Sequence, residues 1–162
     1  MLFRSLKKAS KDKKVLLVVT DGEDNASRYT FEELIRYAQK SNAVIYAIGL
    51  LGNAEPGGLF KIHGSGPHHA AKILERLAQA TGGQLFLPKS LDEVAPTCVQ
   101  IARDIRNQYT LAYYPTNAKK DGTFRQVRID AFEPPSRSRL TIRTRPGYYA
   151  PKEQTASVAA SQ

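Results

Sequence analysis

The segment Val15–Thr20 (VLLVVT) constrains this chain most, because its residues are almost wholly apolar and mostly β-branched. Such a run is typical of a parallel strand that is covered on both faces. A second run of this kind, Ala43–Leu50 (AVIYAIGL), and a short one, Gln84–Leu87, follow along the chain. A segment with helical periodicity comes after each run, so the order is β-α-β-α-β-α. This order predicts a parallel sheet with right-handed crossovers.

Two of the helical segments carry clear start and stop signals. Thr30 stands three residues before Glu33, the spacing of a capping box, and begins a helix that is predicted to end near Asn42. The next helix is predicted over residues 69–83. Gly82 lies near the end of this helix, at the position where the backbone commonly adopts a left-handed conformation, which favours glycine.

The third helical segment contains a conflict. Ser90 and Glu93 form a second capping-box pattern, and an apolar stripe runs from there to about Asn107. Pro96 lies within the segment, and an interior proline costs a helix roughly 3 kcal/mol. We therefore expect a kink or a later start. Cys98, the only cysteine, lies on the apolar stripe and is predicted to be a core residue.

The pattern changes near residue 109. Residues 109–115, 124–132 and 139–145 read as three strands without helices between them, and apolar and polar residues alternate along the last two. The predicted fold class is therefore α/β: a partial doubly wound (Rossmann-like) parallel sheet of three strands with three helices, plus a C-terminal antiparallel β meander. The predicted division is an α/β region over 1–108, a β extension over 109–150 and a disordered tail over 151–162.

Length and composition set the outer limits. The chain has 162 residues, which suits one domain of ordinary size. No apolar run approaches the roughly 20 residues that a membrane-spanning helix needs, so no membrane span is expected. The first 14 residues contain lysine and arginine but no apolar stretch of signal-peptide length, so no export signal is expected in this sequence.

The acidic turn after the first strand is the best candidate for chemistry. Ligands of open α/β sheets bind outside the carboxyl ends of the strands, and Asp21, Glu23 and Asp24 lie at such an end. Their oxygens suit Mg²⁺ or another hard divalent cation. The other two strands end without a carboxylate, so weak binding is expected. The alternative is structural: an acidic turn leading into a helix favours the helix dipole.

Other motifs point to chemistry less directly. The acidic turn nearly fits a calcium loop, but Ala26 stands where that loop needs glycine. His63, His68 and His69 are predicted to lie in a solvated, glycine-rich loop rather than to hold a metal. No nucleophilic triad, G-x-G-x-x-G or P-loop motif is present.

Basic residues leave a nucleic-acid alternative open. The net charge is +9, which permits attraction to polyanions. Alternation along the β extension places several arginines on one face, where they could follow a phosphate backbone or protect a sheet edge. These arginines are Arg125, Arg128, Arg137, Arg139, Arg143 and Arg145.

Four phrases in order carry a family resemblance: KKVLLVVTDGEDNAS, AVIYAIGL, LERLAQATGGQLFLP and IARDIRNQYTLAYYP. Together they resemble the second half of a von Willebrand factor type A domain, and more closely the bacterial VWFA-related proteins known especially from acidobacteria. The resemblance covers about residues 13–150. It implies a doubly wound sheet and a module that binds protein ligands. Proteins of the family that it resembles are often exported.

The resemblance also implies a partial metal-ion-dependent adhesion site. Of that site's ligands only the aspartate of the T-D-G turn matches, which places Asp21 at a metal position, with Asp24 as a weaker candidate. The surrounding loop would contribute Thr20, Gly22, Glu23 and Asn25 to binding. No D-x-S-x-S phrase occurs in the sequence, so we expect the chain to be a truncated domain with an incomplete site.

Three hypotheses follow for function. The first is a non-enzymatic, adhesion-type protein-interaction module, and the open edge of residues 15–20 would support self-association or a complementing chain. The second is Mg²⁺-dependent phosphoryl transfer, or a phosphoacceptor that uses Asp21 with Lys89 nearby. The third is nucleic-acid binding through the basic β extension. We favour the first hypothesis, which expects no enzymatic activity.

Overall fold

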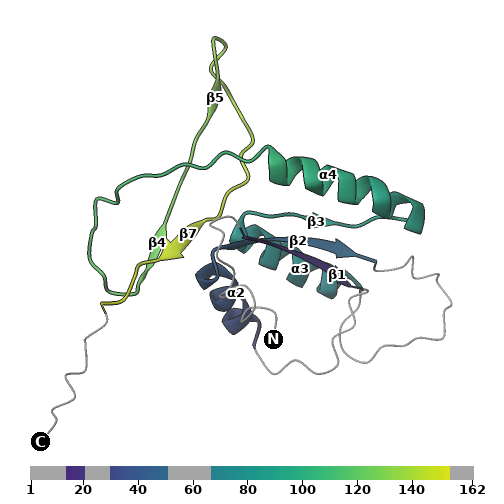
Figure 1. Ribbon diagram of the computed structural model, residues 1–162, viewed down its shortest axis with the longest axis horizontal. Coiled ribbons are helices and arrows are strands. Elements are labelled where there is room, and N and C mark those ends of the chain that lie inside the picture. Colours follow the sequence, from purple (N-terminus) through teal and green to yellow (C-terminus); the bar gives the residue numbers. More distant parts are fainter. Residues whose placement is uncertain (1–13, 21–29, 51–66, 154–162) are drawn as a thin grey trace, which may run out of the picture.

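The computed structural model describes residues 14–20, 30–50 and 67–153. Its centre is a parallel sheet of β1 (Lys14–Thr20), β2 (Ala43–Gly49) and β3 (Leu85–Phe86), in the order β1-β2-β3. Strand β1 pairs with β2 along its whole length, whereas β3 pairs with only two residues of β2. The three strands run in the same direction, as Figure 1 shows, and the predicted β-α-β-α-β-α order is confirmed.

Helices cover both faces of this sheet. Helices α2 (Phe31–Lys40) and α3 (Pro67–Thr81) lie on one face, and α4 (Val94–Arg106) lies on the other (Figure 1). A short 3₁₀ turn, η1 (Leu91–Glu93), leads into α4. This layering confirms the predicted α/β fold class, a three-stranded parallel sheet with three helices.

Two apolar clusters fix the helices against β2. On one face, Ile45 packs with Ala38 of α2 and Leu77 of α3. On the other face, Ile48 packs with Ile101 of α4 and with Tyr46. Strand β2 is nearly completely buried because both of its faces are covered. Its uninterrupted apolar sequence is therefore what this position requires.

The local signals of the first two helices are confirmed. The Glu33 N–H donates to Thr30 Oγ1 at 3.3 Å, and the Thr30 N–H donates to Glu33 Oε2 at 2.9 Å, which completes the capping box. Gly82 follows α3 with a φ of +83°. The backbone turns sharply there to bring the next glycine against β2. A Cβ on Gly83 would lie 1.9 Å from the Ile45 carbonyl oxygen, so this approach requires glycine.

Two predictions about α4 are wrong, and one is confirmed. The Ser90 side chain makes no cap hydrogen bond; the Glu93 carboxylate accepts from the Lys89 N–H at 2.7 Å instead. Cys98 is exposed, whereas Ile101 and Ile105 are the α4 side chains in the apolar cluster with β2. The predicted later start is confirmed, because α4 begins at Val94. Pro96 therefore falls in the first turn, where N–H groups have no intrahelical acceptor.

The C-terminal part forms two small antiparallel sheets, which confirms that the predicted extension is antiparallel. Strand β4 (Phe124–Gln126) pairs with β7 (Gly147–Tyr149), and β5 (Phe132–Glu133) pairs with β6 (Ser138–Arg139) at the distal hairpin. We call residues 124–149 the C-terminal ribbon. The predicted strand over 109–115 is wrong, because that segment forms no strand and belongs to none of the sheets of the described structure.

Candidate functional site

The carboxyl edge of the sheet was the predicted site, and the structure describes part of it. Thr20 ends β1 opposite Gly49 of β2, and its carbonyl oxygen accepts from the Leu50 N–H at 2.8 Å. The turn after Thr20 therefore leaves from the edge where ligands of open α/β sheets bind. The remaining predicted site residues lie outside the described residues: Asp21, Gly22, Glu23, Asp24 and Asn25.

The described residues were searched for clusters of metal-ligating side chains. Within the ranges that the structure describes, no three histidine, cysteine, aspartate or glutamate side chains come together as metal ligands. The Glu93 carboxylate, which follows β3, accepts from the Lys89 backbone. A magnesium site at this edge would therefore depend on the acidic turn and on water.

The structure tests the loop prediction for two of the three histidines, and His69 also begins the helix predicted over residues 69–83. His68 and His69 lie in the first turn of α3, which begins at Pro67, and not in a loop. His63 lies outside the described residues.

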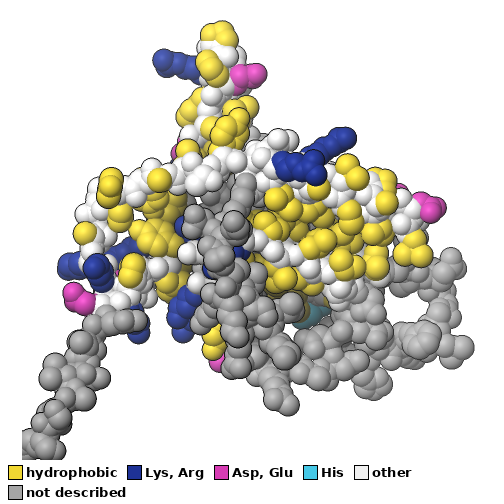
Figure 2. Space-filling view, viewed as in Figure 1, with side chains coloured by type: hydrophobic (Ala, Val, Ile, Leu, Met, Phe, Trp, Pro, Cys, Tyr) yellow, Lys and Arg dark blue, Asp and Glu magenta, His cyan; other side chains and the backbone are white. Residues whose placement is uncertain are grey.

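Strand β1 is an apolar edge in the described structure. Leu16 and Val18 pack toward α2 and α3, so Leu17 and Val19 face the opposite side. They are 42% and 53% exposed, whereas Val15 at the start of β1 packs against the cluster of Tyr46, Ile48 and Ile101. Figure 2 shows hydrophobic side chains gathered over α4 and the sheet beside it.

Most arginines of the β extension are already paired. Arg143 donates to Asp104 of α4 at 2.6 Å, which ties the C-terminal ribbon to the α/β layer. Arg125 pairs with Asp121 at 2.9 Å. Arg128 and Arg139 share one carboxylate, that of Asp130. This pairing reduces the positive charge available to a phosphate backbone, and so it weakens the nucleic-acid alternative.

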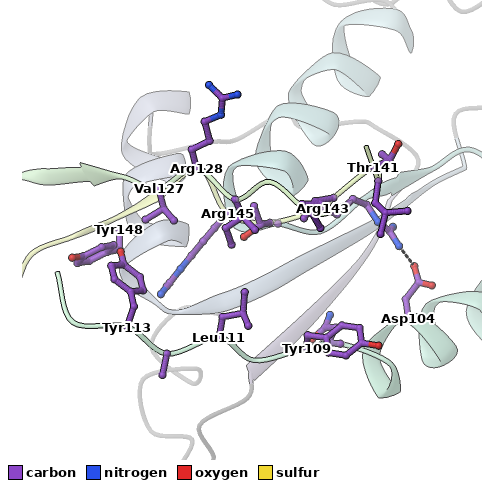
Figure 3. A pocket seen from close by; sticks show the side chains of 18 of the residues that line it. Asp104, Tyr109, Leu111, Tyr113, Val127, Arg128, Thr141, Arg143, Arg145 and Tyr148 are labelled. Atoms are coloured by element: carbon purple, nitrogen blue, oxygen red, sulfur yellow. Dashed lines mark hydrogen bonds and ion pairs between the residues drawn. The ribbon is translucent and has the colours of Figure 1, made fainter. Parts of the chain in front are cut away.

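A groove lies at the opposite end of the sheet, near the amino ends of its strands. It has a volume of about 1250 Å³ and opens between residues 107–115 and the C-terminal ribbon. Figure 3 shows Leu111 and Tyr113 directed from the first wall toward the ribbon, where Tyr148 lies beside Tyr113. Gln108 fixes the start of this wall, because its Nε2 donates to the Tyr46 hydroxyl at 3.1 Å.

Arg145 is one of the charged side chains that line the groove. Its Nη1 donates to Asn42 Oδ1 at 2.7 Å, and its guanidinium lies 6.0 Å from the centre of the Tyr148 ring. Desolvation and the nearby Tyr148 hydroxyl raise the pKa of the Tyr113 phenol, while the charge of Arg145 acts in the opposite direction. Two phenols and one guanidinium therefore share a small region.

The groove was missed at the level of sequence. Its signal is a period of two in Tyr109, Leu111 and Tyr113, which line one wall. The sequence predicted a strand over 109–115, which the structure does not form. The position of residues 109–115 opposite the C-terminal ribbon depends on contacts between residues far apart in the chain.

The layered parallel sheet defines an open α/β domain with helices on both faces. Residues 2–96 match the von Willebrand factor type A domain. The match spans more than half of the chain, and the protein belongs to this family. The groove is built mostly from residues beyond the matched segment.

No curated protein gave a significant match. A solved structure described as an uncharacterized membrane-spanning protein from Vibrio fischeri is similar, with 24% identity and a TM-score of 0.44. The similarity covers 56% of this chain and 46% of that protein, so the chain spans about half of its length. Among the described residues, none of the helices is both long and apolar enough to cross a bilayer.

Proposed function

We propose that this protein is a non-enzymatic protein-interaction module whose ligand surface is the carboxyl edge of the sheet. Family membership supports this proposal, because type A domains are typically interaction modules. The position of Thr20 carries it further: β1 ends beside Gly49, and the Thr20-Asp21-Gly22 phrase starts at this edge. Binding there requires no reacting group, only a surface that the sheet holds in place.

The proposed cation at this site is weakly held. Asp21 is its protein ligand, Asp24 a lesser one, and water completes the shell. Isothermal titration of the pure protein with MgCl₂ or MnCl₂ tests this. We expect binding only at millimolar concentrations, lost in Asp21→Asn and retained in the matched variant Glu32→Gln. Micromolar binding by the monomer would show a complete site and overturn this part of the proposal.

Phosphoryl transfer is the alternative that uses the same aspartate. It predicts an acid-stable, base-labile acyl phosphate on Asp21 after incubation with acetyl phosphate and Mg²⁺. The proposal expects no mass increase of about 80 Da, the mass of one phosphoryl group. Intact-protein mass spectrometry, with Asp21→Asn as the control, separates the two functions.

The proposal includes self-association through β1. The strand is seven residues long, pairs with β2 alone within the described structure, and exposes Leu17 and Val19 on the uncovered face. A long apolar edge is a template for pairing with another strand. Two copies related by a two-fold axis would bury the same patch on both.

Light scattering coupled to gel filtration tests the association. We expect a concentration-dependent dimer that Val19→Lys converts to a monomer. Leu140→Lys places the same charge on a comparably exposed residue of the C-terminal ribbon, and it should leave the dimer intact. A monomer at all concentrations, or equal effects of the two variants, contradicts self-association; a heterodimer with another chain would indicate a complementing partner.

We also propose that residues 13–150 correspond to the second half of a type A domain of the bacterial VWFA-related kind. The support is the T-D-G turn at Asp21 together with the missing D-x-S-x-S phrase. The genomic DNA upstream of Met1 tests this. An in-frame D-x-S-x-S phrase there is expected, and its absence would remove the proposal.

A further inference from the structure

The groove at the amino edge carries an inference that is independent of the carboxyl edge. We propose that it binds an extended acidic peptide of another protein, and that a carboxylate of this peptide pairs with Arg145. Three features of the walls lead to this occupant: the state of the backbone, the apolar side chains and the distribution of charge.

The first feature is an unpaired backbone. Residues 109–115 belong to no helix or strand, and the chain after α4 runs as a long, drawn-out trace (Figure 1). Within the described structure, the N–H and C=O groups of these residues make no backbone hydrogen bond. The facing ribbon residues 128–130 and 141–144 likewise lie between the paired ends of the ribbon, without ladder partners among the described residues. Exposed extended backbone of this kind binds peptides by strand addition.

The second feature is apolar character on both walls. Leu111, 69% exposed, lines the groove from one side, and Val127, Ile129 and Leu140 line it from the other. Tyr114 is also in the first wall, but it is 100% exposed and does not line the groove. An added strand would place alternate apolar side chains between these walls. The volume of about 1250 Å³ exceeds the usual range for small-molecule pockets, which suits a peptide.

The third feature is charge. Three arginines and one aspartate line the groove, and two of the arginines, Arg128 and Arg143, already pair with aspartates. Arg145 contacts Asn42 and Tyr148 but pairs with no carboxylate in the described part of the chain. A peptide carboxylate would accept a charge-assisted hydrogen bond from the Arg145 guanidinium. A second copy of this chain fits less well, because each copy carries a net charge of +9.

Fluorescence polarisation with a designed peptide tests the proposal. The probe is a fluorescein-labelled octapeptide of alternating glutamate and valine, and its counterpart alternates lysine and valine. We expect saturable binding of the first peptide and at least tenfold weaker binding of the second. N-methylation of alternate valines should also weaken binding, since it removes donors that strand addition uses.

Matched variants locate the binding site. Leu111→Asp should weaken binding at least tenfold, whereas Tyr114→Asp, with the same added charge three residues away, should change it less than twofold. Arg145→Gln should weaken binding at least tenfold, whereas Arg137→Gln at the distal hairpin should not. Circular dichroism melting of each variant confirms that it is folded, and Asp21→Asn should bind the peptide normally, which separates this site from the proposed function.

Each remaining outcome supports or overturns the proposed peptide site. A loss of affinity on amidation of the peptide C-terminus identifies the terminal carboxylate as the group bound by Arg145, and no loss identifies a glutamate side chain; both support the proposal. Equal effects of Leu111→Asp and Tyr114→Asp overturn it. So does tighter binding of a labelled oligothymidylate that is lost in Arg145→Gln, which would make the groove a nucleic-acid site.

Discussion

Strand β2 and the C-terminal ribbon are built on opposite principles. Ile45 and Ile48 of β2 are completely buried between helices on both faces. The ribbon buries little apolar surface, and ion pairs such as Arg143–Asp104 and close backbone contacts hold it to the α/β layer. Apolar burial carries most of the free energy of folding, while partly exposed ion pairs contribute about 1 kcal/mol or less. The α/β layer therefore sets the stability, and the ribbon is free to shape a surface.

The largest expected effect tests this division. Ile48→Ala should lower the free energy of unfolding by about 2–5 kcal/mol, because it leaves a cavity between β2 and α4. Leu111→Ala in the groove wall should change it by less than about 0.5 kcal/mol. Urea unfolding followed by circular dichroism measures both. Similar losses in the two variants would show that the extension shares the core's stability.

A glycine comparison tests how the ribbon is docked. Gly82 and Gly122 both have positive φ, so alanine at either should cost roughly 1–2 kcal/mol in backbone strain. At Gly82 the new Cβ would also lie 2.8 Å from the Arg145 backbone nitrogen, whereas at Gly122 it meets only the flexible Lys152 side chain. Gly82→Ala should therefore cost about 1 kcal/mol more in urea unfolding. Equal costs would contradict a tight contact between ribbon and sheet.

The smallest effect concerns acid pH, with one carboxyl group in each region. Hydrogen bonds from Thr30 hold the pKa of Glu33 below its ordinary value, and those from Thr123 do the same for Asp121. Each group therefore stabilises the fold above its ordinary carboxyl pKa, and this contribution is lost as the pH falls through the lowered pKa.

Carboxyl-carbon NMR titration measures these two groups directly. Both should titrate below ordinary carboxylates, and Thr30→Ala should return the pKa of Glu33, but not that of Asp121, toward its ordinary value. An ordinary pKa for Glu33 in the wild-type protein would show that the capping box does not persist in solution.

Much of the α/β layer could be predicted because its signals are local. The apolar run of β2 and the Thr30–Glu33 capping box each depend on neighbouring residues. Pro96 at the start of α4 was also predictable, since proline fits the first helical turn. The core prediction for Cys98 was wrong because the apolar stripe of α4 is wider than the part of the helix that contacts the sheet.

The candidate sites were harder to predict. The position of the carboxyl edge followed from the strand order, and the structure places Thr20 there, while Asp21 and its neighbours lie outside the described residues. The groove was not predicted, because apolar alternation in residues 109–115 shows which side chains share a face but not what that face meets.

The sequence by itself determined the elements of the α/β layer and their order, because helix caps, glycine turns and buried strands act over a few residues. Only the tertiary structure decided that β1 exposes one face, that the extension's arginines pair with aspartates, and that residues 109–115 form the wall of a groove. These features depend on contacts between residues far apart in the chain. Local periodicity does not specify such contacts.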